Sequence, residues 1–463
     1  MSGRLSWCRP VDGQEQEIAM SMSRSPMCTP QEHLWSRRQW LGKAGSAVAA
    51  TTALGLGVAD SIGVGTGSGL ATAAFGEELK GLDKQVLFVW IDGGMSQFES
   101  WDPKPNSQFG GPFRPISTSL PGVQLCELMP QTARQMHRLA VVRSLCTQDN
   151  SHSAGVPRIL RGDPKNRGVT YPYFGSAVAK LMGPGSSNLP PYVWIKPGSG
   201  GFKHENAGFL GPKYGALAFG DGLPPENLQR PEMLTEDAAG LRDELRQLAN
   251  RRYLAGRMTT NTEASSAVFD MASSLLARKE LFDTSLVDQR DIDRYGAHEF
   301  GRHMLLGRRM LEAGIRFVQV TSYGWDTHGD NFNGHASLMP RFDQAFASMI
   351  EDLHDRGMMD RVLVVCLSEF GRTPRINGQS GRDHWPESWS LAMSGAGIKP
   401  GVVVGATNEK GTSVSTEPYD IGHLFHTWFK ALGIDSRQTE YDNAGQPLPI
   451  AHDDCGPVAD VLA

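Results

Sequence analysis

The sequence has little net charge, few cysteines and no long run of strongly apolar residues. A formal net charge of −5 over 463 residues is too small to indicate binding to nucleic acid or to a membrane surface. The six cysteines form neither a C-x-x-C motif nor zinc-finger spacing, so the sequence gives no sign of a thiolate metal site. Residues 44–59 are uncharged, but they are too rich in glycine to predict a good transmembrane helix.

The N-terminal segment has the order of an export signal. SRRQWLGK at 36–43 precedes the uncharged stretch, and ATA at 71–73 supplies a small-x-small cleavage site. The Arg37-Arg38 pair resembles a twin-arginine signal, which would make the twin-arginine export machinery a partner. We therefore expect residues 1–73 to be signal and leader, and the mature protein to be periplasmic or extracellular without a stable membrane span. A basic, flexible tail is the alternative.

Four cysteines remain in the mature chain: Cys126, Cys146, Cys366 and Cys455. An oxidising compartment would permit a disulfide between Cys126 and Cys146, but their spacing does not establish one. Cys366 lies inside an apolar run and is most simply a small, buried hydrophobic residue.

The mature chain, residues 74–463, alternates apolar runs with helical segments. The runs at 85–94, 139–145, 316–322 and 361–368 predict buried strands, and 401–407 predicts a shorter one. Helical spacing at 338–358 and 420–434 predicts helices between and after them. This alternation indicates an α/β fold with a mostly parallel sheet covered on both faces. From about 183 to 313 the pattern differs, and we expect a helical or irregular insertion or cap within the single domain.

Carboxylate and imidazole side chains follow three of the predicted strands. In parallel α/β sheets the working residues collect at the carboxyl ends of strands. A mixed Asp/His set there suits zinc, manganese or iron better than calcium. For any one residue, a turn, an exposed loop or a helix cap is an equally good explanation, but the coincidence of several favours a metal site. The candidate ligands are Asp92, Asp326, His328, Glu369, Asp383 and His384.

Arg372 and Arg375 follow Glu369 closely in the sequence. An arginine can bind a phosphate, sulfate or carboxylate with two parallel hydrogen bonds. An ion pair to Glu369 or Asp383 that only stiffens the loop is the alternative, and the sequence does not choose between them.

Four motifs jointly resemble a known family. WDPKP (101–105), GWDTHG (324–329), EFGRTP (369–374) and GRDHWP (381–386) are similar to a bacterial family of sulfatase-like proteins, domain of unknown function 1501, in the alkaline phosphatase superfamily. The likeness covers roughly residues 85–445. It implies an alkaline phosphatase-like three-layer sandwich.

The resemblance also implies roles for single residues. Asp92 matches the metal ligand of the first strand, and Asp326, His328 and His384 match one metal site, with His335 a second candidate for its histidine. Glu369 stands where the superfamily has Asp, and Phe370 stands where a second site would have His. One site therefore looks complete and the other incomplete. We expect one divalent transition metal, zinc or manganese.

HSAGVPRILRG (152–162) resembles the sulfatase segment that carries the nucleophile, and His152 falls in the nucleophile position. A histidine there could attack phosphorus covalently, act as general base or bind the metal, and a ligand or general base is the preferred role for His152. The flanking serines, Ser151 and Ser153, are the next candidates because a shift of one residue would restore a hydroxyl nucleophile. A structural histidine that caps the following helix is the remaining alternative.

These expectations combine into an exported, metal-dependent hydrolase of phosphate or sulfate esters. Arg372 would hold the anionic oxygens of a small-molecule or glycan ester. Tyr192, Trp194 and Phe202, in the aromatic region 183–232, would form a wall for a sugar-like substrate, although core packing explains them equally well. A non-catalytic binding or scaffold protein is the main alternative, and an isomerase that moves a phosphate within a molecule is a third.

Overall fold

The computed structural model describes residues 83–162, 167–185, 187, 189–198, 207–223, 233–255 and 260–463. The expected export signal at 1–73 lies outside these residues and stays a prediction. Among the described residues, no helix combines the length and the apolar character needed to cross a membrane.

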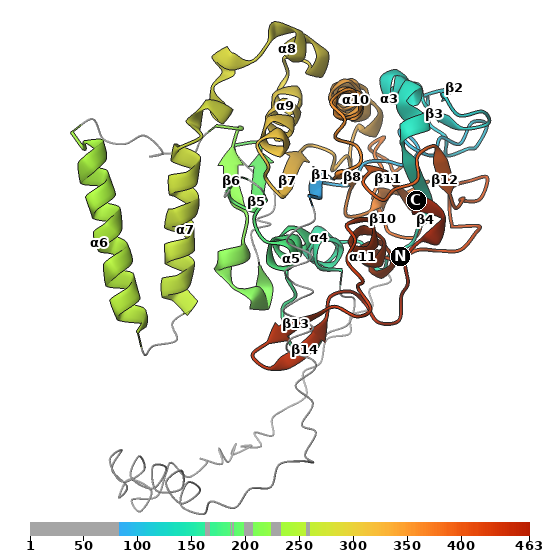
Figure 1. Cartoon of the computed structure of the whole chain (residues 1–463). Coiled ribbons are helices and arrows are strands. Elements are labelled where there is room, and N and C mark those ends of the chain that lie inside the picture. Colours follow the sequence, from blue (N-terminus) through green and yellow to red (C-terminus); the bar gives the residue numbers. More distant parts are fainter. Residues whose placement is uncertain are drawn as a thin grey trace, which may run out of the picture. The chain divides into compact units, whose positions relative to one another are not determined.

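An eight-stranded sheet forms the centre of the described chain (Figure 1). β11 runs antiparallel to its neighbours β4 and β8, and the other neighbouring strands pair in parallel. The carboxyl ends of β1, β7 and β8 therefore meet at one edge of the sheet. In spatial order the strands are β12 (Val402–Val404), β4 (Ala140–Leu145), β11 (Trp389–Gly395), β8 (Val362–Leu367), β1 (Gln85–Ile91), β7 (Phe317–Ser322), β5 (Tyr192–Lys196) and β6 (Leu217–Gly220).

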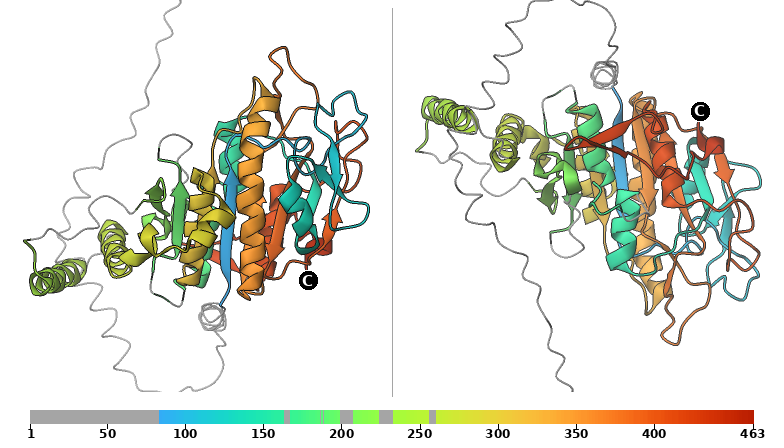
Figure 2. Two further views of the ribbon diagram at one scale, coloured as in Figure 1. Left: turned by 90° about the horizontal axis from the view of Figure 1, so that it is seen from above. Right: turned by 90° about the horizontal axis from the view of Figure 1, so that it is seen from below.

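Helices cover both faces of this sheet (Figure 2). Alternate side chains of a strand point to opposite faces, so Phe88 and Trp90 of β1 join one apolar core and Leu87 and Val89 the other. Each fully buried side chain of this kind contributes roughly 1.5–3 kcal/mol. The α/β fold expected from the sequence is confirmed. The first core packs on α4 (His152–Arg161), α5 (Phe174–Met182) and α11 (Ile421–Ala431), and the second on α3 (Pro130–Gln135), α9 (Glu299–Glu312) and α10 (Asn331–Asp355).

Shorter elements lie around the sheet. Three small antiparallel pairs are β2 (Pro115–Ser117) with β3 (Gln124–Cys126), β9 (Gly371–Arg372) with β10 (His384–Trp385), and β13 (Glu440–Asn443) with β14 (Gln446–Pro449). The remaining α-helices of the described chain are α6 (Glu236–Leu254), α7 (Thr260–Leu276) and α8 (Gln289–Tyr295).

The expected insertion at 183–313 is in part sheet. β5 and β6 extend the sheet beyond β7, while α6 and α7 lie outside it (Figure 1). Tyr192 and Trp194 belong to β5 and are buried, and Trp194 Nε1 donates to Thr321 Oγ1 at 2.8 Å. The expectation that these two side chains form a substrate wall is therefore wrong, because they pack in the core. Phe202 lies outside the described residues.

The four described cysteines are separate thiols. Cys126 is buried in β3, and Cys146 follows β4 without bonding to it, so the disulfide that the compartment would permit is not formed. Cys366 lies in β8 with 1% of its surface exposed, which confirms its expected role as a small core residue.

Candidate metal centre

Close backbone packing at the carboxyl edge of the sheet brings three loops together. Gly93 follows β1 with φ of 117°, and a Cβ at this position would lie 2.5 Å from the amide nitrogen of Asp326. Only glycine allows this approach between the loops after β1 and β7. After β8, the β9–β10 pair sets Arg372 opposite His384. The loops after β1, β7 and β8 thus form one surface.

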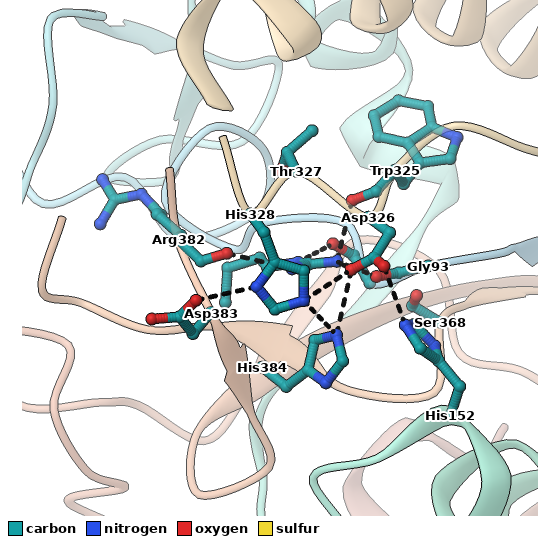
Figure 3. Close-up of polar contacts among 12 residues, drawn as sticks. Gly93, His152, Trp325, Asp326, Thr327, His328, Ser368, Arg382, Asp383 and His384 are labelled. Carbon is teal, nitrogen blue, oxygen red and sulfur yellow. Dashed lines mark hydrogen bonds and ion pairs between the residues drawn. The ribbon is translucent and has the colours of Figure 1, made fainter. Parts of the chain in front are cut away.

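Three imidazoles converge on the carboxylate of Asp326 (Figure 3). The Nε2 atoms of His384 and His328 lie 3.0 Å and 3.2 Å from Asp326 Oδ1. The Nε2 atom of His152 lies 3.1 Å from the other oxygen, Oδ2. We call Asp326, His152, His328 and His384 the Asp326 cluster. The expected ligands Asp326, His328 and His384 therefore lie together, and His152 lies beside them.

The second ring nitrogen of each histidine faces an acceptor. His152 Nδ1 lies 2.7 Å from Glu369 Oε1, and His328 Nδ1 lies 2.8 Å from Asp383 Oδ1. The third, His384 Nδ1, lies 2.7 Å from the carbonyl oxygen of Asn150. An acceptor at Nδ1 keeps the hydrogen there and leaves the lone pair on Nε2, as in histidines that bind metals. Glu369 and Asp383 therefore orient His152 and His328 through contacts at their Nδ1 atoms.

The distances within the cluster fit a metal with four ligands. Ligand atoms at zinc–nitrogen distances of 2.0–2.1 Å in a tetrahedral site lie about 3.3 Å apart. His328 Nε2 and His384 Nε2 are 3.0 Å apart, and both lie close to Asp326 Oδ1. His152, Asp326 and His384 also place ligand atoms within 4.8 Å of one another. With the hydrogen of each ring on Nδ1, the two Nε2 lone pairs face each other at 3.0 Å, and a cation between them removes their repulsion, so the donor set fits a metal.

The pKa shifts of Asp326 and His384 favour the protonation states that bind a metal. Burial opposes the charged form of Asp326, but the hydrogen bond and the positive charge of Arg372 outweigh it, with the contacts to His384 and His152 adding to the effect, and the pKa of Asp326 stays well below its usual range. Burial lowers the pKa of His384. A hydrogen bond to Glu369 raises the pKa of His152, although burial acts against it. At neutral pH the cluster thus presents a carboxylate and a neutral imidazole, the forms that bind metals.

Arg372 has a different position from the one expected. Its side chain is fully buried, and its guanidinium donates to Asp326 Oδ1 at 2.6 Å. It also donates to the backbone carbonyls of Gly93, Gly94, Trp325 and Arg382. With its donors engaged in this way, Arg372 is not placed to clamp the oxygens of a substrate. It fixes Asp326 and joins the three loops.

The ring of Phe370 packs against two histidines of the Asp326 cluster. Phe370 stacks on His384 with ring centres 4.2 Å apart, and its ring also contacts His152. Asp92 is buried and accepts from Trp90 Nε1 at 3.2 Å. Burial raises the pKa of Asp92 to about 7, and the charge of Glu369 adds to this rise. Asp92 therefore lies beside the cluster without joining its contacts.

The two serines and His335 have hydrogen-bond partners outside the cluster. Ser151 and Ser153 are exposed, and their hydroxyl oxygens lie 3.3 Å from each other. His335 is fully buried, and its Nε2 accepts from the Ser96 amide at 3.1 Å while Nδ1 faces the Asn331 carbonyl. His335 is therefore a core histidine, and its candidacy as a ligand is wrong.

A buried ion pair that sequence reasoning missed supports the loop of His384. Arg382 donates to both oxygens of Glu99, at 2.8 Å and 3.1 Å, and both side chains are fully buried. Arg382 also donates to the carbonyls of Thr373 and Pro374 in the same loop. The two partners are 283 positions apart, and no local pattern connects them.

Residues 83–462 match the family described as "Protein of unknown function (DUF1501)", and the chain belongs to that family. No curated protein matches the chain.

Solved structures of an alkaline phosphatase superfamily protein and of a sulfatase resemble the chain weakly. A protein in the alkaline phosphatase superfamily from Vibrio parahaemolyticus is 12% identical over 77% of this chain and 67% of its own, with a TM-score of 0.31. The PsFucS1 sulfatase from Pseudoalteromonas sp. is 12% identical over 85% and 75%, with a TM-score of 0.34. The C-terminal periplasmic domain of EcEptC from Escherichia coli, a complex with Zn, is 11% identical over 83% and 96%, with a TM-score of 0.36.

Proposed function

We propose that this protein is an exported hydrolase of phosphate or sulfate esters that uses one divalent transition metal, zinc or manganese. The observation that carries the proposal is the convergence of three Nε2 atoms on Asp326, each from a histidine whose Nδ1 faces an acceptor. Asp326, His328 and His384 would hold the metal, because the Nε2 atoms of both histidines face Asp326 Oδ1.

The metal, when bound, polarises an ester oxygen and offsets the negative charge that develops on it. His152 is the general base, because Glu369 holds its Nδ1 and leaves Nε2 at the site. The water oxygen bonds to phosphorus or sulfur, the bond to the alcohol oxygen breaks, and His152 accepts the proton of the attacking water. The proton for the released alcohol comes from solvent.

Anion recognition rests on the start of α4 instead of Arg372. His152 is the first residue of this ten-residue helix, so the helix N-terminus lies at the Asp326 cluster. The amide groups and the positive dipole end of a helix N-terminus favour phosphate and sulfate groups. Positive charge from the helix and the metal then takes the place of the expected arginine clamp.

The test uses the full-length chain with 4-nitrophenyl phosphate and 4-nitrophenyl sulfate. We expect hydrolysis that a chelator abolishes and that zinc or manganese restores. His328→Ala should lose both metal and hydrolysis, whereas His152→Gln should keep the metal and lose at least about 10²-fold in rate, the usual contribution of a general base. Loss of metal in His152→Gln, with hydrolysis intact in His328→Ala, would reverse the assigned roles.

A metal-dependent binding protein without catalysis is the second candidate. Phe370 beside the cluster and the outward position of Ser151 and Ser153 favour it. Metal binding that depends on His384, together with no hydrolysis of either ester, would support this candidate against the hydrolase.

Export through the twin-arginine route is part of the proposal. Arg37→Lys together with Arg38→Lys keeps the charge and removes the arginine pair. We expect this double variant to accumulate inside the cell, as fractionation and immunoblotting would show. Unchanged localisation would contradict this part alone.

A further inference from the structure

A pocket opens at the carboxyl ends of β5, β6 and β7. Its volume is about 310 Å³, and no residue of the Asp326 cluster lines it. Pro197 and Asp221 follow β5 and β6, Ser322 ends β7, and the start of α9 closes another side. The pocket therefore lies on the same sheet edge as the Asp326 cluster, over different strands.

His298, His303 and Tyr323 line this pocket, and each has a buried polar atom without a partner at hydrogen-bond geometry. His303 on α9 has 1% of its surface exposed, and neither ring nitrogen has a partner at hydrogen-bond geometry, although the Asp221 backbone lies near enough to affect its pKa. The hydroxyl oxygen of Tyr323 is likewise buried and unpartnered. Leaving such a group unpaired costs about 1–3 kcal/mol. These groups line the pocket, so a ligand with hydroxyl groups could satisfy them.

The charges that surround the pocket balance each other. Asp221 and Glu299 supply two carboxyl groups, and burial raises the pKa of Glu299, with the neighbouring Asp221 adding to the rise. Arg341 lines the pocket as well, and the charge of Arg302 reaches His303. The carboxyl pair disfavours an anion, and the two arginines offset the attraction for an amine. A neutral polar ligand fits this balance best.

The pocket wall is partly aromatic. The rings of Phe300 and Phe342 both line it and stack with centres 6.0 Å apart and an interplanar angle of 21°. Phe300 and Phe342 are 8% and 1% exposed, so they offer a sugar the apolar edges of their rings, while carboxyl, imidazole and phenol groups suit its hydroxyls. A few polar groups placed on an apolar wall are typical of small-molecule sites.

We propose that this pocket binds a neutral sugar ring. Tyr323 lines the pocket and stands three residues before Asp326, so the loop after β7 carries a residue of the pocket and a residue of the Asp326 cluster. The sugar is therefore the alcohol part of the ester, and this assignment rests on the proposed function. Binding of the sugar to the pocket does not depend on the proposed function.

The test measures sugar binding by the full-length protein in the presence of a chelator, so that the metal has no part in it. D-Glucose, D-galactose, L-fucose and N-acetyl-D-glucosamine are screened by saturation-transfer NMR, and any binder is titrated by calorimetry. We expect at least one to bind. Tyr323→Phe should weaken its binding about 2- to 10-fold, the usual effect of losing one neutral hydrogen bond. Glu299→Gln tests the carboxyl pair if Tyr323→Phe does not fold.

Tyr253→Phe is the matched control, because it removes a hydroxyl from the half-exposed Tyr253 on α6, outside the pocket. It should bind the sugar as the wild type does. No binding of any of the four sugars, equal affinity in Tyr323→Phe and Glu299→Gln, or binding of methylammonium instead would overturn the proposal. Sugar binding without ester hydrolysis would reject the hydrolase and keep the pocket, and hydrolysis without sugar binding would do the reverse.

Discussion

Two polar regions lie close together in this protein, and their histidines are used in opposite ways. In the inner network, defined as Glu99, Asn331, His335 and Arg382, each side chain is fully buried. The two ring nitrogens of His335 both meet the backbone, and Glu99 accepts from Arg382 and Asn331. Each of these side chains is thus hydrogen-bonded to a protein group inside the fold.

The Asp326 cluster is open by comparison. The side chains of Asp326 and His328 are 43% and 45% exposed. Each histidine has one nitrogen held by an acceptor, while the other nitrogens crowd around one carboxylate. A polar network that stabilises a fold has a separate partner for each group, whereas a metal site leaves several donors pointing at one place. The pairing of both nitrogens therefore separates a structural histidine from a candidate ligand.

The largest expected effect comes from breaking the inner network. Glu99→Gln removes the charge that pairs with the buried Arg382. We expect a loss of about 3–5 kcal/mol in the free energy of unfolding, since an uncompensated buried charge is costly. Chemical denaturation with a chelator present measures this loss. The double variant Glu99→Leu with Arg382→Met should recover much of it, and a loss below 1 kcal/mol in Glu99→Gln would show that the pair is not buried as described.

A smaller effect is expected from Glu369 and Asp383, the acceptors at the Nδ1 atoms of His152 and His328. Glu369→Gln weakens the acceptor at His152 Nδ1 and should lower the proposed ester hydrolysis of the metal-loaded protein about 10- to 100-fold. Asp383→Asn is the matched control, because Asp383 holds His328 in the same way but is 53% exposed. Its effect should be smaller, because solvent screens an exposed pair. Steady-state kinetics at saturating metal compares the two, and a larger effect for Asp383→Asn would contradict this order.

The smallest effect concerns the pH dependence of stability. Burial lowers the pKa of His335. Glu99 and the Asn331 carbonyl act against this decrease, whereas the charges of Arg372 and Arg382 lower the pKa of His335 further. The unfolded chain then binds a proton below about pH 6.5 that the folded chain does not, so stability falls as the pH falls. The contribution of His335 is up to about 1.4 kcal/mol per pH unit below that pKa.

His335→Gln tests this contribution, because glutamine does not titrate. Denaturation at pH 7, 6 and 5 should give a shallower loss of stability for the variant than for the wild type. Parallel curves would mean that the proton reaches His335 in the folded state as readily as in the unfolded chain.

The sequence predicted the parts of the fold that depend on continuous apolar runs. The strands at 85–91, 140–145, 317–322 and 362–367 were found because both faces of each are buried. The sequence pattern did not predict β5, β6 or β11. These strands are short or contain Trp and Ser, and they lie between prolines and glycines, so they form no continuous apolar run.

For the site, position at a strand end predicted more than residue type did. Asp326, His328 and His384 meet as expected, because parallel strands deliver their loops to one edge. Arg372 was given the wrong role, because the sequence does not say whether a guanidinium will find carbonyl groups inside the fold or remain open to a ligand. The pocket at His303 was missed for a similar reason, since its lining comes from five separate segments.

The most direct test of the metal centre is the metal content of the purified full-length protein, measured by mass spectrometry. We expect about one equivalent of zinc or manganese in the wild type and a loss of most of it in His384→Ala. Tyr253→Phe should retain it. A folded wild-type protein without metal, or a His384→Ala variant that keeps its metal, would contradict the assignment of the Asp326 cluster as a metal site.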